Sequence, residues 1–317
     1  METKRRNRLN PKPRKTPTGK KHKLRVTDGD VEIFQILQRY RYLPTNFIYE
    51  LLPTERNYGK FQERLTDLSG HGFLKRPPQQ LDTFNAFYKK IVYELNPKAK
   101  AILRERDEYF DISIGNGNSY HHEALTCLII ASIEIASSEF TFIDWPQILN
   151  AKMLPEETKT SPKPFNIPLI GLTQKSLVPD GTPFCIKGSK TLCFAGTETD
   201  MSTENLTGTR KVTIEKKFKA YLNIAQHRTY KKHFGFPNMV IPFVTTSEKR
   251  MGNMMKLLET VTNGKGCSFI VFKSTPHLRS VESSPDPIDF ISGAWRRVGH
   301  PPFDLVNELS KQKPPSP

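Results

Sequence analysis

The spacing of apolar residues changes part-way along the chain, and this change most limits the possible folds. Before residue 97 they recur three or four apart and then enter a hairpin pattern. After residue 121, apolar strands alternate with amphipathic helices, and a glycine- and asparagine-rich stretch at 115–119 separates the two patterns. The 317 residues therefore predict two domains and a fold of class α+β or α/β.

Residues 26–110 are predicted to form a winged helix-turn-helix. A first helix begins at Asp28 or Asp30, and a short second helix ends before Pro53. The third helix, expected over residues 54–68, has its apolar residues on one face. A strand from Phe73 and a returning strand over residues 87–95 complete the wing. Three helices followed by a hairpin is the order of elements in this DNA-binding fold.

Basic and polar side chains on this predicted domain point to contacts with double-stranded DNA. The outer face of the third helix carries the candidates for the major groove, Arg56, Asn57, Lys60 and Arg64. Lys75 and Arg76, with Lys89 and Lys90, are expected to contact phosphates beside the wing. The alternative is a protein-interaction module on which these side chains are merely solvated.

Positive charge is concentrated at the N-terminus. The chain carries a formal net charge of +16, and residues 1–25 hold 11 of its 48 Lys and Arg but only one acid, Glu2. With so few apolar residues, 1–25 is expected to be a disordered arm. Such an arm attracts nucleic-acid phosphates. A solubilising tail, or RNA binding by the arm alone, is the alternative.

Several protein classes are excluded by what the sequence lacks. No apolar run approaches the ~20 residues that a membrane-spanning helix needs, so no membrane insertion is expected. The basic N-terminus has no apolar segment of the kind found in secretory signals. The four cysteines contain no C-x-x-C pair, which argues against a zinc ribbon and a disulfide scaffold. A reduced, cytoplasmic setting is the simplest interpretation.

The second domain is predicted over residues 121–275. A buried helix at 121–137 starts it, followed by a strand at 139–144 and a loop excursion at 151–178. Two strands at 184–186 and 192–198 form a hairpin, and one long helix is expected over 213–233. A strand, a helix and a strand follow as far as residue 272. Residues 276–317 are expected to be a partly disordered extension.

Acidic residues gather around the predicted hairpin. Asp180 precedes its first strand, and Glu198 and Asp200 follow its second on one face of the chain. A hairpin brings these ends together, and converging carboxylates repel unless a positive group lies between them. Mg²⁺ suits such oxygen ligands. The ordinary alternative is a Pro-Asp-Gly turn and acids at the end of a strand.

The run "VPDGTPFCIKGSKTLCFAGTETD…EKKFKAY" resembles the replication-relaxation family of plasmid and mobile-element proteins. The family includes relaxases of the MobC type, which nick a plasmid origin for conjugation, mobilisation or replication. The resemblance implies a winged helix joined to a restriction-endonuclease-like nuclease domain of the PD-(D/E)xK kind, with a mixed sheet. Its implied partners are origin DNA and a coupling ATPase or other relaxosome proteins.

By this resemblance, Asp180 and Glu198 are ligands of Mg²⁺ or Mn²⁺, and Asp200 is a third metal-binding acid or an outer group. The common pattern has a lysine two residues after the glutamate, where this chain has Asp200. Lys217 is then the catalytic lysine, supplied from a helix on which Tyr221 shares its face. His121 is expected near the acids. The predicted function is a metal-dependent DNA nickase, and the alternative is a non-enzymatic replication or mobilisation factor with an inactive nuclease-like domain.

Overall fold

In the computed structural model, the chain forms two compact units. Unit 1 comprises residues 1–110 and 280–286, and unit 2 comprises residues 111–279 and 287–317. The described residues are 24–54, 56–80, 90–112, 119–201, 205–208, 213–276, 281 and 286–310. Most of the predicted basic arm, and residues 81–89 of the predicted wing with Lys89, lie outside them.

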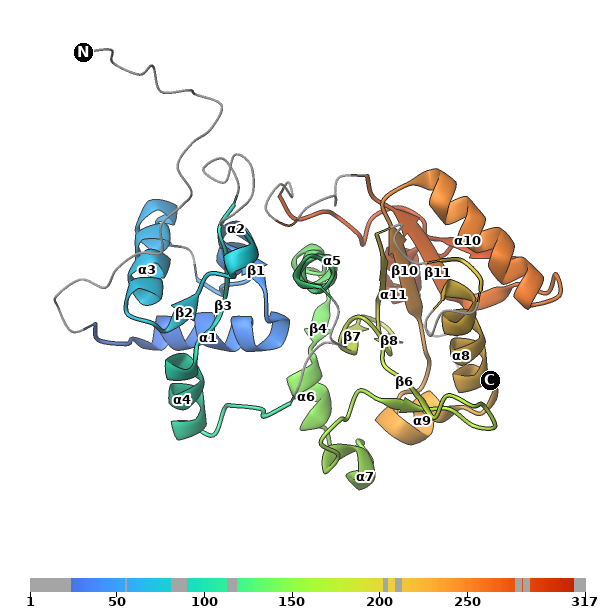
Figure 1. The fold of residues 1–317 in the computed structure, drawn as a ribbon, viewed down its shortest axis with the longest axis horizontal. Helices are drawn as coiled ribbons and strands as arrows, with labels where there is room; N and C mark the ends of the chain where they lie inside the picture. Colours follow the sequence, from blue (N-terminus) through green and yellow to red (C-terminus); the bar gives the residue numbers. More distant parts are fainter. Residues whose placement is uncertain are drawn as a thin grey trace, which may run out of the picture. The chain divides into compact units, whose positions relative to one another are not determined.

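Unit 1 combines four α-helices and a small antiparallel sheet among its described residues (Figure 1). Its elements are α1 (Asp28–Tyr40), β1 (Leu43–Pro44), α2 (Thr45–Glu50), α3 (Tyr58–Gly70), β2 (Leu74–Lys75), the 3-10 turn Pro78–Gln80, β3 (Val92–Leu95) and α4 (Pro97–Glu105). Strand β3 lies between β1 and β2 and is antiparallel to both. This order of elements agrees with the one expected for residues 26–110.

Capping residues set the helix boundaries in unit 1. Thr27 and Asp30 form a capping box at the start of α1. The Asn57 side chain accepts a hydrogen bond from the Lys60 N–H, so α3 begins at Tyr58 and not near residue 54 as expected. The inner face of α3 is buried as the sequence predicts.

A short segment between the two sequence stretches of unit 2 belongs to unit 1. Val281 is fully buried, and the Asp286 carboxylate lies 3.1 Å from Lys90 Nζ. Asp286 also accepts a hydrogen bond from the Asn46 side chain. Residues 280–286 therefore belong to the first unit, although they follow most of the second in sequence.

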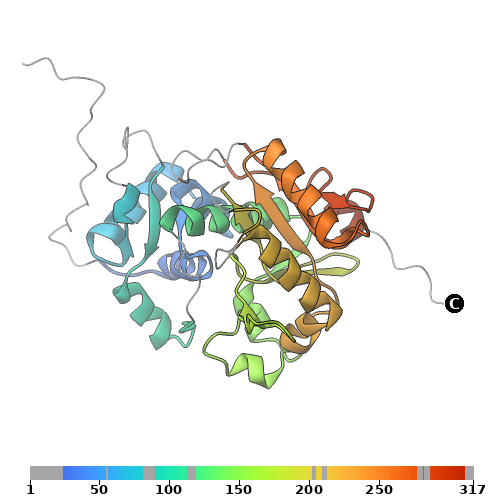
Figure 2. The same ribbon diagram turned by 45° about the vertical axis from the view of Figure 1, so that its right-hand side comes forward.

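The main sheet of unit 2 has the order β12-β11-β10-β9. Its strands are β9 (Glu198–Asp200), β10 (Ile241–Thr245), β11 (Cys267–Ser274) and β12 (Arg296–Val298). Strands β9, β10 and β11 are parallel, so helices must connect them. These connections are α8 (Ile214–Gln226), α9 (Thr229–Phe234) and α10 (Glu248–Val261). Helices α8 and α10 pack together, as Figure 2 also shows.

A second sheet of unit 2 consists of β4 (Thr141–Ile143), β7 (Phe184–Lys187) and β8 (Thr191–Phe194). The chain of β8 continues into β9 through residues 195–197. Phe194 bridges to Val240, and Glu198 pairs with Phe243. The stretch from Phe194 to Glu198 therefore has one residue more than the stretch from Val240 to Phe243 that it faces. The strand predicted over 192–198 is therefore interrupted by a bulge.

Helix α5 (Tyr120–Ala136) lies on the opposite side of β9 from α8 and α10 (Figure 1). Side chains alternate along β9, so Thr199 faces α5, whereas Glu198 and Asp200 face α8 and α10. Phe243 of the fully buried β10 packs with Phe218 and Phe272 in the core. No helix in the described part of the chain has the length and apolar run needed to cross a bilayer.

Three segments of unit 2 differ from expectation. The predicted helix over 213–233 is divided at Arg228, whose φ of 51° is left-handed. The excursion at 151–178, which follows α6 (Trp145–Leu149), contains α7 (Glu156–Lys159) and the hairpin of β5 (Ile167–Pro168) and β6 (Ser176–Leu177). The C-terminal part, predicted only as an extension, includes β12 and α11 (Leu305–Ser310), with Trp295 and Leu309 buried.

Candidate active site

Three of the side chains singled out from the sequence meet at β9. Lys217 Nζ lies 3.0 Å from Asp180 Oδ2 and 2.7 Å from Glu198 Oε2. Asp180 comes from the turn before β7, Glu198 from the first position of β9, and Lys217 from the first turns of α8. The exposed fractions of the three side chains are 1%, 1% and 6%. Two carboxyl groups therefore share one buried ammonium.

The bulge before β9 is what brings Asp180 to this point. The Gly181 N–H donates to the Thr197 carbonyl, which joins the Asp180 turn to the bulge. A Cβ on Gly196 would lie 2.3 Å from Cβ of Pro179, so only glycine allows this close approach. The Thr199 N–H then donates to Asp180 Oδ2 at 3.2 Å.

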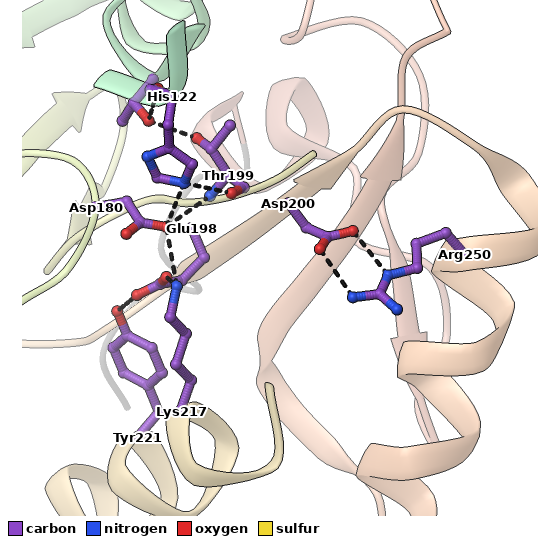
Figure 3. A network of polar contacts seen from close by, with 9 residues as sticks. His122, Asp180, Glu198, Thr199, Asp200, Lys217, Tyr221 and Arg250 are labelled. Carbon is purple, nitrogen blue, oxygen red and sulfur yellow. Dashed lines mark hydrogen bonds and ion pairs between the residues drawn. The ribbon is translucent and has the colours of Figure 1, made fainter. Parts of the chain in front are cut away.

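Two further side chains complete the cluster shown in Figure 3. His122 of α5 places Nε2 2.8 Å from the Thr199 carbonyl and 3.4 Å from Asp180 Oδ2. The Tyr221 hydroxyl, one turn beyond Lys217 on α8, donates to Glu198 Oε1. Asp180 therefore contacts both Lys217 and His122, and Glu198 accepts a hydrogen bond from Tyr221.

The environment separates the ionisation of the two acids. Burial alone would raise the pKa of Asp180, but the charge of Lys217 and the contact with His122 outweigh it and hold the pKa well below its usual value. Burial, followed by the nearby charge of Asp180, raises the pKa of Glu198 well above its usual value. Burial and Glu198 likewise raise the pKa of Tyr221. Asp180 is therefore the ionised acid, and Glu198 retains its proton to a higher pH.

Asp200 does not join this cluster. Its carboxylate accepts two hydrogen bonds from Arg250 of α10, at 2.9 Å from Nε and 3.0 Å from Nη2. The Thr245 hydroxyl of β10 donates a third at 2.8 Å. This arrangement ties the ends of β9 and β10 to α10 (Figure 3). Asp200 lies on the same side of β9 as Glu198, as predicted, but its oxygens are occupied by Arg250 and Thr245.

The oxygens of Asp180 and Glu198 suit a hard cation, whereas a three-carboxylate site is not formed. Within the described residues, no three His, Cys, Asp or Glu side chains are grouped as a metal site. Mg²⁺ commonly takes only one or two carboxylates from a protein. The two acids already converge on one positive centre, because Lys217 Nζ lies 3.0 Å from Asp180 Oδ2 and 2.7 Å from Glu198 Oε2. Two buried carboxyl groups that converge in this way are compatible with such an ion at this position.

His121 was expected near the acids, but its neighbour His122 contacts the cluster. Thr126, four residues after His122, donates to the Thr199 hydroxyl at 2.8 Å. Two polar residues spaced by four on an otherwise apolar helix share one face. That spacing could have predicted which face of α5 packs against β9. Arg250 left no comparable signal, because its partner lies 50 residues away.

The predicted DNA-contacting arginines of unit 1 have partners within that unit. Arg56 forms an ion pair with Glu32, and Arg64 forms one with the buried Asp30. Burial would raise the pKa of Asp30, but the hydrogen bonds from Arg64 and Thr27 lower it below its usual value. Arg64 therefore links α3 to α1, and Arg56 links the segment before α3 to α1, whatever else they contact.

The other predicted contact residues differ in their accessibility. Lys60 is exposed on α3, and Asn57 is exposed while capping that helix. Lys75 is half exposed and lies 3.0 Å from Glu94. Arg76 is buried, and its guanidinium contacts the hydroxyl of Tyr93. Lys60 is the most available of the described candidates for an outside partner.

A sequence model of the family described as Replication-relaxation matches residues 34–240, which include α3 of unit 1 and the cluster of Asp180, Glu198 and Lys217. No curated protein and no solved structure matches the chain.

Proposed function

Because this chain belongs to the replication-relaxation family, we propose that it cuts one strand of plasmid or mobile-element DNA during replication or relaxation. The observation that carries the proposal is the meeting of Asp180, Glu198 and Lys217 at one edge strand. These residues come from three elements, and their chemistry is that of metal-dependent phosphodiester cleavage. The proposed substrate is double-stranded DNA, consistent with the net charge of +16.

Each residue of the cluster has a distinct proposed role. Asp180 and Glu198 would hold Mg²⁺ or Mn²⁺, which when bound polarises a phosphodiester and lowers the pKa of an attacking water. Lys217 places a positive charge beside both acids, where it can stabilise the negative charge that develops on the phosphate. Tyr221 fixes Glu198 through its hydrogen bond to Oε1. Because the pKa of Glu198 is raised, this acid must lose its proton before it can act as a ligand.

A nicking assay tests the proposal. Supercoiled plasmid carrying the cognate origin is incubated with Mg²⁺ or Mn²⁺, and the open-circle product is measured. The variant Asp180→Ala/Glu198→Ala is expected to lose nicking. A matched variant, Glu139→Ala/Glu259→Ala, removes two exposed acids of unit 2 and should cut as the wild type does. Equal nicking by the wild type and the Asp180/Glu198 variant would refute the assignment.

One observation favours a second candidate function, a DNA-binding accessory factor without nuclease activity. The acids are almost fully buried, and Lys217 already compensates their charge. A cluster of this kind can serve as a scaffold. This candidate predicts DNA binding that persists in EDTA and no nicking under any metal condition. A gel-shift experiment with and without EDTA, run beside the nicking assay, separates the two functions.

A further inference from the structure

Exposed basic residues lie on the excursion of unit 2 (residues 151–178) and on helix α9, which packs against the excursion. Strand β5 and helix α7 of the excursion both contact α9, and both figures show these segments together (Figures 1 and 2). We call the exposed basic residues of these segments the excursion surface: Lys159, Lys163, Lys175, Arg228, Lys231 and Lys232. None of the six is in an ion pair with another described residue. The exposed acids of this region are Glu156 and Glu157 of α7.

Polar side chains of α8 and α9 hold the excursion in place. His233 of α9 contacts the Pro164 carbonyl through Nε2 at 2.7 Å. The Thr158 hydroxyl donates to the His233 carbonyl at 2.6 Å. Asn223 of α8 binds both the N–H and the carbonyl of Ile170, at 3.0 and 2.8 Å. These hydrogen bonds hold the excursion against α8 and α9, and a preformed binding region lowers the entropic cost of binding a partner.

The tip of the excursion adds exposed apolar groups to this charge. Ile170 and Leu172 are 43% and 37% exposed, on either side of Gly171, which has a φ of 73°. The two hydrogen bonds between the Asn223 side chain and the Ile170 backbone fix the first of them. Lysines and arginines suit phosphates, and small apolar side chains in DNA-binding proteins contact or wedge between bases in the minor groove.

We propose that the excursion surface binds duplex DNA, with its basic residues on the phosphates and the Ile170–Leu172 tip against the groove. The identity of the partner rests on the proposed function, but the surface does not depend on whether the acid cluster cuts. This surface lies outside the region predicted to bind DNA in unit 1. Through this surface, unit 2 binds the DNA independently of unit 1.

The salt dependence of DNA affinity tests this surface directly. Binding of the full-length chain to a labelled duplex is measured in EDTA at several salt concentrations for Lys231→Ala/Lys232→Ala. Each lost phosphate contact lowers the slope of log K against log salt by about 0.9, so this variant should lose about 1.8. The matched control, Lys249→Ala/Lys256→Ala, removes the same charge from exposed positions of α10. Its slope should change by less than half as much.

A second variant tests the apolar tip. Ile170→Ser/Leu172→Ser should weaken binding several-fold with an unchanged salt slope, because it removes no charge. Equal slopes for the α9 variant and wild type, or equal losses in the α9 and α10 variants, would overturn the proposal. An unchanged affinity in the tip variant would overturn the role of the tip. Failure of nicking by the acid cluster would leave all these binding results intact, so the two proposals can fail separately.

Discussion

Lys217 compensates the negative charge of the buried acids Asp180 and Glu198 in unit 2. Its replacement, Lys217→Met, leaves Asp180 and Glu198 buried without their shared cation. Removing one partner of a buried ion pair typically costs about 3–5 kcal/mol, so a large drop in the free energy of unfolding is expected. The measurement is urea unfolding followed by circular dichroism.

Lys216 provides the matched control for this prediction, because it is the exposed neighbour on the same helix. Lys216→Met should change the free energy of unfolding by less than about 0.5 kcal/mol. A triple variant, Asp180→Asn/Glu198→Gln/Lys217→Met, removes every charge of the trio and should recover part of the stability. Equal effects of the two lysine substitutions would show that the ammonium does not balance the acids.

His122 is expected to make stability depend on pH. Burial disfavours the charged imidazole, but the hydrogen bond and charge of Asp180 outweigh this and raise the pKa of His122. A raised pKa means that the charged form stabilises the fold fully below about pH 6.5, the value in the unfolded chain, and less as pH rises through the folded value. The difference in melting temperature between wild type and His122→Gln should therefore be largest at pH 5–6 and shrink above pH 7. A difference that is constant across this range would contradict the prediction.

The sequence predicted part of this site. Asp180 and Glu198 could be named because they bracket a hairpin, whereas Lys217, with Tyr221 on its face of the helix, could be named only from the family resemblance. The partner of Asp200 could not, because Arg250 reaches it only through the parallel pairing of β9 with β10. Long-range pairing of this kind depends on the whole sheet and leaves no local pattern in the chain.

At the scale of elements, the bulge between β8 and β9 is the feature most sensitive to added volume. Gly196→Ala would place a methyl group 2.3 Å from Pro179 Cβ, so the turn carrying Asp180 must shift. Overpacking of this kind costs about 1–3 kcal/mol, and nicking should fall more than DNA binding does. Gly252→Ala on α10 is the control, because nothing lies within 4 Å of its added carbon. That helix substitution should be neutral or stabilising. Equal losses in both variants would argue against crowding at the bulge.

Helix α3 carries one basic residue that stabilises the fold, Arg64, and one that is available to contact DNA, Lys60. Arg64→Ala leaves the buried Asp30 without its guanidinium partner and should lower the free energy of unfolding by about 1–3 kcal/mol. Lys60→Ala removes an exposed charge and should weaken DNA binding with unchanged stability. Circular dichroism and gel-shift titration of both variants give the comparison. Loss of stability in Lys60→Ala, or none in Arg64→Ala, would reverse these roles.

Most elements were predictable from apolar spacing, and each exception has an identifiable cause. Helix α5, strand β10 and helix α10 lie close to the expected residues because each is a single strong pattern. The helix expected over 213–233 is divided because Arg228 takes a left-handed conformation, which propensity alone does not indicate. The excursion was expected as a loop because its order comes from His233 and Asn223, outside the segment.

At the scale of the whole molecule, the segment of residues 280–286 makes unit 1 depend on residues near the C-terminus. Val281 is fully buried, so Val281→Asp should destabilise unit 1 by about 3 kcal/mol or more. Asp286→Ala on the same segment is the control, because this side chain is 91% exposed and its ion pair is worth at most about 1 kcal/mol. Thermal melting by circular dichroism should show an early transition in the first variant alone. Its absence would mean that the segment is dispensable for the unit.

The two tryptophans of the chain, Trp145 and Trp295, are both buried in unit 2. Intrinsic indole emission therefore reports on that unit alone. Loss of structure in unit 1 should leave the emission maximum unshifted, while unfolding around the acid cluster should move it to longer wavelength. A single optical titration can thus assign the damage caused by any substitution to one half of the protein without labelling either half.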